Sequence, residues 1–226
     1  MFRIIQSKKA NILFITLLYI FSFGLHAGEV YTSFPDKIEP DAKYVFYSHG
    51  YIVEGDNPKP VHPKFGVYDF PAIKEKLADK SYHLIAYHRA ANSKAEESVK
   101  RLMSDVNRLM AAGVKPENIT LTGFSKGGAI TIQTSSVLKN DNLNFVIMAG
   151  CFKGLEKQQD LKFYGRVYSI YETTDNVGSC QFIADRSDEK SFSELAITTG
   201  KSHGAFYLPI DEWTVPLKSW MKEHYN

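Results

Sequence analysis

The stretch that decides the fold is residues 119–128, ITLTGFSKGG. A short β-branched run leads directly into a Gly-x-Ser-x-Gly motif, and a further glycine and a helical pattern follow. This order predicts a strand, a very tight turn and a helix, with Ser125 at the tip of the turn. Gly123 and Gly127 flank the serine because a side chain there would collide where the strand and the helix almost touch. The turn would place the Ser125 hydroxyl at the positive end of the helix.

Strands and helices alternate along the chain on both sides of this motif. Continuous apolar runs, typical of strands buried on both faces, predict strands at 43–47, 83–88, 119–124, 144–149, 166–171 and 194–199. Helical spacing of apolar residues predicts helices at 68–80, 94–112, 127–138 and 211–224. Ser93 and Glu96 are spaced as a capping box at the start of the second helix. The alternation predicts an α/β protein with a mostly parallel central sheet and helices on both faces.

Polar residues that follow the predicted strands are candidate site residues, because parallel sheets bind ligands at the carboxyl ends of their strands. Asp175 follows the strand at 166–171, and His203 follows the strand at 194–199. A serine hydroxyl is a poor nucleophile until a nearby base accepts its proton, and a carboxylate best orients that base. The chain therefore supplies a nucleophile, an orienting acid and a base in that order.

Each of these residues also has a simpler interpretation. Ser125 can serve as a helix N-cap in a glycine-rich turn, and His203 can be an ordinary loop histidine. Glu172 competes with Asp175 as the acid because it lies nearer the end of the strand, although Asp175 better fits the usual offset into the loop. The expected order places the base after the serine and the acid. It therefore disfavours as the base the histidines in the central part of the chain that precede Ser125, which are His49, His62, His83 and His88.

With these residues the chain resembles the α/β-hydrolase superfamily, over the segment from the His49-Gly50 turn to His203-Gly204. The resemblance implies that Ser125 is the nucleophile. It implies further that His203 is the general base and then the general acid, and that Asp175 orients the imidazole. Taken together, the elements in this order are far more specific than the Gly-x-Ser-x-Gly motif alone.

The same resemblance implies an oxyanion hole beside the serine. Its donors would be two backbone N–H groups, those of Tyr51 and Lys126. Tyr51 lies in a glycine-containing turn after an early strand, and Lys126 follows the nucleophile directly. The chain looks like a compact, lidless bacterial serine hydrolase, because the segment at 151–163 is too short for a separate lid domain.

The resemblance thus implies an esterase-like serine hydrolase that cleaves an ester or a thioester through an acyl-enzyme. The signal-peptide pattern of residues 1–27 predicts that this hydrolase is exported. Its partner would be a small-molecule acyl substrate, and the chemistry requires no cofactor. Two alternatives stay open, an acyltransferase that uses the same triad and a non-catalytic binding protein on the same fold. No oligomeric state is predicted.

His88 and Arg89 are candidate residues for the rim of the substrate site, because they follow a strand that should neighbour the serine strand. Together with the Lys126 side chain, they would favour a substrate that carries a carboxylate or a phosphate near the scissile bond. The alternative is that Arg89 forms a structural ion pair with an acidic side chain.

Cys151 and Cys180, the only cysteines, follow sequential strands whose carboxyl-end loops should approach each other. Export would favour a disulfide between them. That bond would brace the loop carrying Asp175 and contribute roughly 3 kcal/mol. No metal site is predicted, because no pair of histidines has the close helical spacing of a metal site and two distant cysteines make no zinc knuckle.

Residues 1–27 have the pattern of a signal peptide, with three cations and no acidic residue. The apolar run at 12–25 is shorter than the about 20 residues of a membrane span. Cleavage near Ala27 would change the net charge from +2 to −1, and no basic arm would remain to bind nucleic acid. We therefore expect a periplasmic or secreted single domain at 28–226 without a stable membrane span. An uncleaved N-terminal anchor is the alternative.

Overall fold

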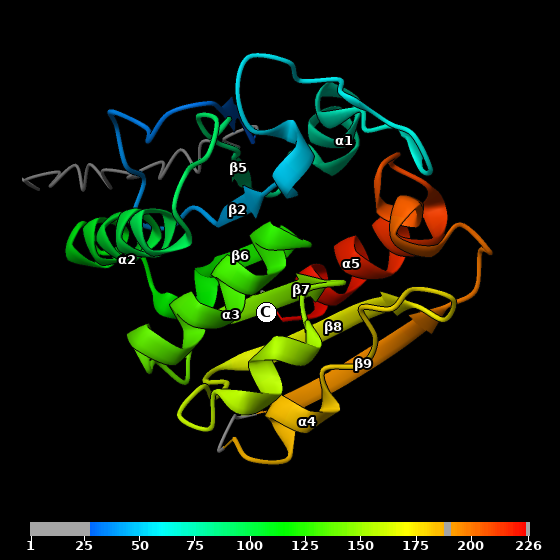
Figure 1. Ribbon diagram of the computed structural model, residues 1–226. Helices are drawn as coiled ribbons and strands as arrows, with labels where there is room; N and C mark the ends of the chain where they lie inside the picture. The colour runs from blue at the N-terminus through cyan, green and yellow to red at the C-terminus, as the bar shows by residue number, and fades with distance from the viewer. Residues whose placement is uncertain (1–27, 188–190, 225–226) are drawn as a thin grey trace, which may run out of the picture.

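Seven strands form one sheet in which every pairing is parallel, and helices cover both of its faces (Figure 1). The computed structural model describes residues 28–187 and 191–224, so the predicted signal peptide at 1–27 lies outside the described residues. Within those two ranges, no helix is both long and apolar enough to cross a membrane.

The sheet contains the strands in the order β1-β5-β2-β6-β7-β8-β9. Their bounds are β1 (Val30–Tyr31), β2 (Tyr44–Ser48), β5 (His83–Ile85), β6 (Ile119–Phe124), β7 (Asn144–Met148), β8 (Arg166–Glu172) and β9 (Ser191–Ile197). A separate antiparallel hairpin consists of β3 (Val61–His62) and β4 (Gly66–Val67). All six predicted strands are confirmed, and their ends shift by up to three residues. The strands missing from the prediction have only two residues each, too few to carry a periodic pattern.

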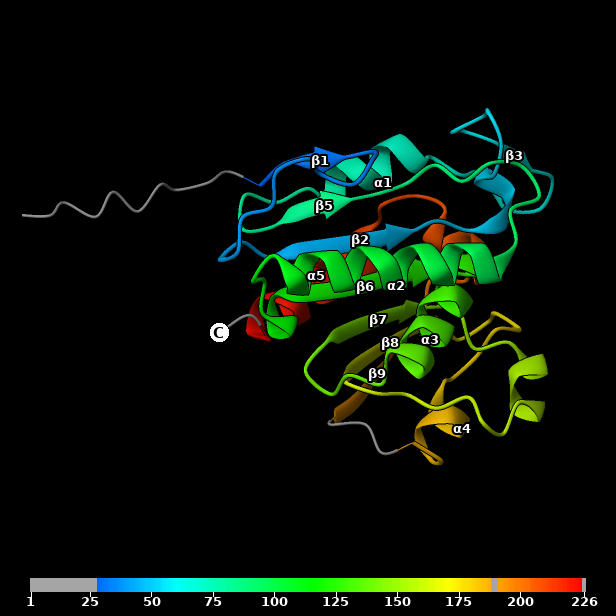
Figure 2. The same ribbon diagram turned by 90° about the vertical axis from the view of Figure 1, so that its left-hand side faces the viewer.

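The helices form two layers (Figures 1 and 2). On one face lie α2 (Ala95–Ala111), α3 (Lys126–Leu138) and α4 (Gln181–Ala184), and on the other lie α1 (Phe70–Leu77) and α5 (Asp211–Glu223). Within the described residues there are also four short 3-10 turns, η1 (Tyr51–Val53), η2 (Pro116–Asn118), η3 (Lys153–Lys157) and η4 (Ser202–Phe206).

Alternating side chains of each strand divide the core between the two layers. On β2, Val45 and Tyr47 pack toward α1 and α5, whereas Tyr44 and Phe46 pack toward α2 and α3. All five residues of β2 are buried, as the continuous apolar run predicts. Burial of one large apolar side chain contributes about 1.5–3 kcal/mol, so the central strands form a firm platform for the loops at their carboxyl ends.

The start of α2 differs from the predicted capping box of Ser93 and Glu96. The N-cap residue is Lys94, and no side-chain hydrogen bond caps the helix. The Ser93 hydroxyl instead donates to Oε1 of Glu54 at 2.7 Å. A hydrogen bond to a charged acceptor is about twice as strong as one to a neutral group. The Ser93 hydroxyl therefore bonds to the Glu54 carboxylate and does not cap the helix.

The predicted disulfide is confirmed. Cys151 and Cys180 are bonded, with their Cα atoms 5.2 Å apart. Cys151 lies in the loop after β7, and Cys180 lies between β8 and α4. The bond therefore ties together two loops at the carboxyl edge of the sheet, one of which carries Asp175.

Candidate active site

Ser125 lies in the turn between β6 and α3, with a positive φ of 54°. This conformation costs a non-glycine residue on the order of 1–3 kcal/mol, and such strain clusters at functional sites. Backbone hydrogen bonds hold it in place: the Ser125 N–H donates to the Met148 carbonyl, and the Ser125 carbonyl accepts from the Ala129 N–H, both at 2.9 Å. The serine makes no side-chain capping hydrogen bond, so its hydroxyl is not used as a helix cap.

The two glycines that flank the serine are required by close backbone contact. A Cβ added at Gly127 would lie 1.9 Å from the carbonyl oxygen of Ser48, and one added at Gly123 would lie 2.2 Å from the carbonyl oxygen of Gly127. Real Cβ atoms do not approach other atoms so closely. The sequence interpretation of the turn therefore holds, and β2, β6 and α3 meet at this point.

The structure brings three of the sequence-predicted residues together. Nε2 of His203 lies 2.8 Å from Oγ of Ser125, and Nδ1 of His203 lies 2.6 Å from Oδ2 of Asp175. Because an ionised carboxylate only accepts hydrogen bonds, Nδ1 carries the hydrogen and donates it to Asp175. Nε2 is then free to accept the hydrogen of the Ser125 hydroxyl.

Aromatic rings and burial fix the imidazole between its two partners. The Phe124 ring lies 4.8 Å and the Phe65 ring 6.2 Å from the His203 ring, measured between centroids. The Asp175 side chain is only 5% exposed. Burial in apolar surroundings strengthens the hydrogen bond between Asp175 and His203, because the effective dielectric is lower than in water.

Glu172, the other candidate acid, has a different task. It is fully buried, and its two carboxylate oxygens accept five hydrogen bonds, from the N–H and hydroxyl of Thr174, the N–H and hydroxyl of Thr199 and the N–H of Gly200. Burial raises the pKa of Glu172, but these hydrogen bonds outweigh burial and bring the pKa to about 2. The ionised side chain therefore ties the loop that carries Asp175 to the loop that carries His203.

Tyr51 and Lys126, whose N–H groups were predicted to form an oxyanion hole, each begin a helical turn. Tyr51 is the first residue of η1 and Lys126 the first of α3, and the first N–H groups of a helix have no acceptor within the helix. A Cβ added at Gly50 would lie 3.6 Å from Cβ of Ser125, so the turn of Tyr51 runs beside the serine. The role of these two N–H groups stays a prediction.

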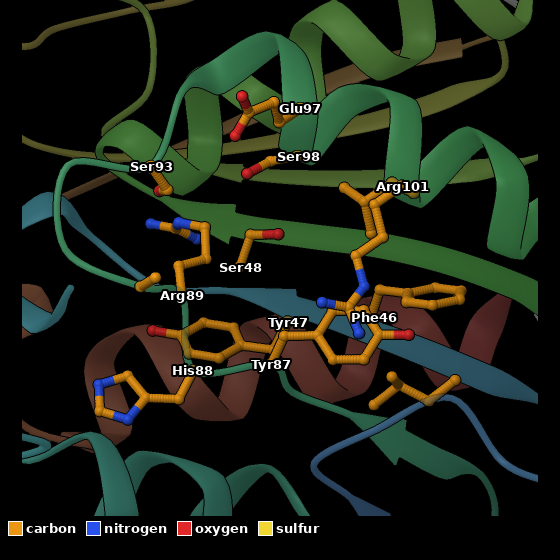
Figure 3. A pocket seen from close by; sticks show the side chains of 13 residues that line it. Phe46, Tyr47, Ser48, Tyr87, His88, Arg89, Ser93, Glu97, Ser98 and Arg101 are labelled. Atoms are coloured by element: carbon orange, nitrogen blue, oxygen red, sulfur yellow. The ribbon is translucent and has the colours of Figure 1, made fainter. Parts of the chain in front are cut away.

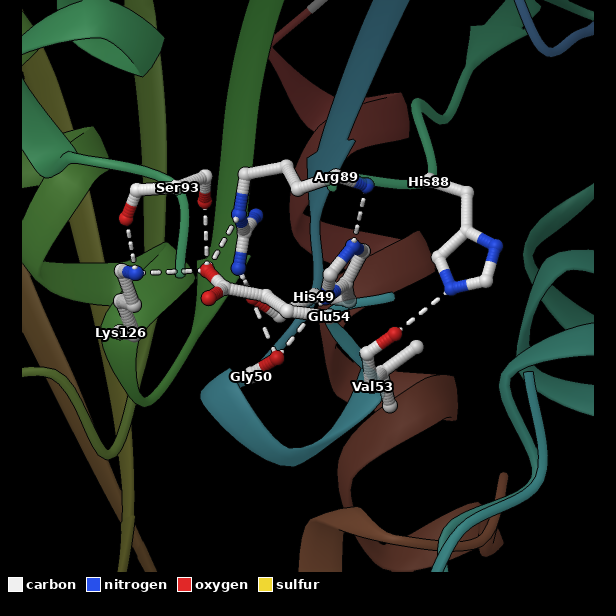
Figure 4. A network of polar contacts seen from close by, with 8 residues as sticks. All are labelled: His49, Gly50, Val53, Glu54, His88, Arg89, Ser93 and Lys126. Atoms are coloured by element: carbon white, nitrogen blue, oxygen red, sulfur yellow. Dashed lines mark hydrogen bonds and ion pairs between the residues drawn. The ribbon is translucent and has the colours of Figure 1, made fainter. Parts of the chain in front are cut away.

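Arg89 adopts the ion-paired arrangement that was the alternative to a place at the rim. Its side chain is 9% exposed, and its Nε donates to Oε1 of Glu54 at 3.2 Å (Figure 4). Lys126 reaches the same oxygen with its Nζ at 2.6 Å, and its Nζ also donates to the carbonyl of Ser93 at 2.6 Å. Arg89 and Lys126, the two cations predicted for the rim, thus both form ion pairs with Glu54. Glu54 was not among the residues predicted from the sequence.

Glu54 lies in an irregular, proline-rich segment, which explains why periodicity gave no hint of its role. Burial raises the pKa of Glu54, but hydrogen bonds from Lys126, Ser93 and Arg89 outweigh it and hold the pKa below its ordinary value. One signal was available: Glu54, Arg89 and Lys126 follow β2, β5 and β6, which are neighbours in the sheet.

His49 is held as a neutral side chain at the base of the same cluster. Its Nδ1 donates to the carbonyl of Gly50 at 2.8 Å, and its Nε2 accepts from the backbone N–H of Arg89 at 3.0 Å. Burial, together with the nearby Arg89 cation, lowers the pKa of His49 to about 3. His88, the other predicted rim residue, is exposed, and its Nε2 donates to the carbonyl of Val53 at 2.6 Å.

A cavity of about 330 Å³ opens beside this cluster, between β2, the loop after β5 and the first turns of α2 (Figure 3). Arg89 and Ser93 lie on its wall, and Arg101 at its side stacks on the Tyr87 ring, 3.6 Å from the ring centre. Its lining residues do not include Ser125, His203 or Asp175. The cavity is therefore separate from the serine, the histidine and the aspartate.

Among the residues that the structure describes, no three His, Cys, Asp or Glu side chains cluster as metal ligands would.

No family model matches the chain, and no curated protein matches it in sequence. Solved structures share its fold. SOBER1 from Arabidopsis thaliana is 13% identical with a TM-score of 0.52, over 82% of this chain and 100% of that one. An arylesterase is 13% identical with a TM-score of 0.57, over 85% of this chain and 79% of that one. A fungal esterase from Rhizomucor miehei is 10% identical with a TM-score of 0.56, over 82% of this chain and 76% of that one.

Proposed function

We propose that this chain, which has the α/β-hydrolase fold of the esterases it resembles, is a serine hydrolase that cleaves an ester or a thioester through an acyl-enzyme. One observation carries the proposal: the His203 imidazole bridges the Ser125 hydroxyl at 2.8 Å and the Asp175 carboxylate at 2.6 Å. The three side chains come from loops after three different strands, so no local folding requirement explains why they meet.

The proposed reaction begins when Ser125 Oγ attacks the carbonyl carbon of the substrate. Nε2 of His203 takes the hydroxyl proton, and Asp175 stabilises the imidazolium that forms. The carbonyl oxygen becomes an oxyanion, which the N–H groups of Tyr51 and Lys126 would bind. His203 then returns the proton to the departing alcohol or thiol. Water, activated by the same imidazole, cleaves the acyl-enzyme and restores the serine.

The test of this proposal is covalent labelling with a fluorophosphonate probe, followed by an assay on chromogenic esters of graded acyl length. We expect the probe to modify Ser125, and we expect Ser125→Ala to abolish labelling and reduce kcat by on the order of 10⁴-fold or more. A wild-type protein that takes no label and hydrolyses no ester would contradict the proposal and favour a binding protein on this fold.

Acyl transfer uses the same three residues and is separated from hydrolysis by the products. With an alcohol or an amine added as a competing acceptor, we expect the free acid to remain the main product. An acylated acceptor as the main product at millimolar concentration would make the protein an acyltransferase instead.

The proposal includes export to the periplasm or the medium. The bond between Cys151 and Cys180 supports export, because disulfides form and persist in oxidising compartments. Mass spectrometry of protein from the periplasm or the medium is expected to find a chain that begins at Gly28. A chain that keeps residues 1–27 and stays in the cytoplasm would contradict this part of the proposal.

A further inference from the structure

We propose that Glu54 is a positioning residue that holds the two halves of the oxyanion hole together, acting through the cations of Arg89 and Lys126. The inference rests on the proposed function, since the N–H groups of Tyr51 and Lys126 matter to catalysis only when an oxyanion forms between them. One N–H belongs to η1 and the other to α3, and these elements are far apart in the sequence.

Glu54 first fixes the turn that carries Tyr51. Its own N–H donates to the Tyr51 carbonyl at 2.9 Å, and its carboxylate accepts from Nε of Arg89 at 3.2 Å. The Nη2 of the same guanidinium donates to the carbonyl of His49 and, at 3.5 Å, to that of Gly50. The peptide bond between Gly50 and Tyr51 is planar, so contacts that fix the Gly50 oxygen also fix the direction of the Tyr51 N–H.

Glu54 also fixes the start of α3. The Nζ of Lys126 lies 2.6 Å from Oε1 of Glu54 and 2.6 Å from the carbonyl oxygen of Ser93. It also lies 5.3 Å from the centre of the Tyr51 ring, within the range of a cation–π contact. The residue whose N–H would bind the oxyanion is thus tied by its side chain to the turn that carries the other N–H. Figure 4 shows the cluster with Glu54 at its centre.

Burial makes this connection sensitive to charge. The Glu54 side chain is 3% exposed and that of Arg89 is 9% exposed, so water screens their interaction weakly. If the carboxylate became neutral, two close cations would repel each other with no anion between them. The turn and α3 would then move apart, and the two N–H groups would no longer converge on one oxygen.

The expected consequence falls on the transition state. The oxyanion exists in the tetrahedral intermediate and the transition states around it, so displaced N–H groups lower kcat without weakening the binding of the intact ester. Removal of one oxyanion-hole donor reduces kcat by roughly 10²–10³-fold in other serine hydrolases, and displacement should cost less. We therefore expect Glu54→Gln to reduce kcat by roughly 10- to 100-fold, with KM changed by less than about threefold.

The experiment measures kcat and KM of Glu54→Gln on the best ester, and the Kd of a trifluoromethyl ketone that copies its acyl group. The ketone forms a tetrahedral adduct with Ser125, so its Kd should weaken by about the same factor as kcat falls. A purely structural role would lower the active fraction but leave the Kd of the folded protein unchanged. Arg89→Lys serves as the second variant, because it keeps the charge and loses the planar fork that reaches two carbonyls. Like Glu54→Gln, Arg89→Lys should lower kcat and raise the Kd of the ketone.

Asp79→Asn is the matched control. Asp79 also bridges two cations, with its Oδ2 3.2 Å from Nζ of Lys218 and 3.3 Å from Nζ of Lys222. It precedes β5 and so lies at the opposite edge of the sheet from Ser125. We expect it to lower thermal stability while kcat and the ketone Kd stay at the wild-type values.

The outcomes separate the two proposals. If the wild type hydrolyses esters but Glu54→Gln and Arg89→Lys change kcat and the ketone Kd no more than Asp79→Asn does, the positioning role is overturned and the proposed function stands. If the wild type hydrolyses no ester and Ser125 takes no fluorophosphonate label, the proposed function fails, and the positioning role fails with it.

Discussion

The two sides of Ser125 are built around two buried glutamates that are held in different ways. On the oxyanion side, comprising residues 49–54 with Arg89, Ser93 and Lys126, Oε1 of Glu54 accepts from two cations and a hydroxyl. Its Oε2 is buried with no partner in the part of the chain that the structure describes. On the acid–base side, comprising residues 172–175 and 199–203, both oxygens of Glu172 accept from uncharged donors.

The difference follows from what each glutamate connects. Glu54 connects side chains, and the cluster that it forms with Arg89 and Lys126 carries one net positive charge beside the place where an oxyanion would form. Glu172 connects the backbones of two loops and introduces no cation near His203. Positive charge therefore gathers on the side where the proposed reaction develops negative charge, and uncharged donors hold the side where it moves a proton.

The largest effect is expected on the acid–base side, at Asp175. The amide of Asp175→Asn would donate to Nδ1 of His203 and leave the hydrogen on Nε2, which could then no longer accept the Ser125 proton. We expect kcat to fall by about 10⁴-fold while the fold is retained. Steady-state kinetics with a circular dichroism spectrum checks this. If kcat fell less than it does in Glu54→Gln, the oxyanion side and not the acid–base side would contribute more to catalysis.

The disulfide ties the loop after β7 to the loop that carries Asp175 on the acid–base side, and its removal should lower stability. The double variant Cys151→Ser with Cys180→Ser opens a loop between residues 29 apart in the sequence. By the chain-entropy argument, the free energy of unfolding should fall by about 3–4 kcal/mol. Urea unfolding of the oxidised wild type and of the double variant measures the difference. If the double variant also lost kcat at a temperature where both proteins are folded, the bond would set the position of Asp175 as well as the stability.

Acid should weaken the acid–base side through Glu172. Its pKa is about 2 in the folded protein against an ordinary value of 4.5, so its contribution to stability is complete above pH 4.5 and is lost as the pH falls toward 2. The advantage of the wild type over Glu172→Gln should therefore shrink by about 3 kcal/mol across this window. Urea unfolding at pH 6 and at pH 2.5 compares the two proteins. A difference that stays constant with pH would exclude an ionised Glu172 as the source of the stability.

The smallest effects are expected from a matched pair of hydroxyl deletions. Ser93→Ala removes the 2.7 Å hydroxyl donor of Glu54, and Thr174→Val removes the 2.6 Å hydroxyl donor of Glu172. Each should lower the free energy of unfolding by about 1.5–3 kcal/mol, as the loss of a hydrogen bond to a charged group does. Thermal unfolding measures both. We expect kcat to fall more in Ser93→Ala, because Glu54 has fewer other donors than Glu172. A larger fall of kcat in the threonine variant would contradict this difference between the two glutamates.

Much of the candidate site followed from local sequence. The residues around Ser125 predict the turn because the strand, the glycines and the helix are contiguous, and only short-range sterics decide their conformation. Asp175, His203 and the disulfide were accessible for a related reason: in a parallel sheet, the loops after successive strands gather at one edge. The order of elements along the chain was therefore enough to propose which residues meet.

The sequence by itself thus determined the parallel α/β architecture and the residues that meet at its carboxyl edge. Only the tertiary structure decided which glutamate does what: Glu54 joins Arg89 and Lys126, Glu172 joins two loops, and Asp175 contacts His203. The physical reason is that every carboxylate can accept the same hydrogen bonds. Which donors a glutamate meets, and how little water remains around it, depends on distances of a few ångströms between loops that are far apart in the chain.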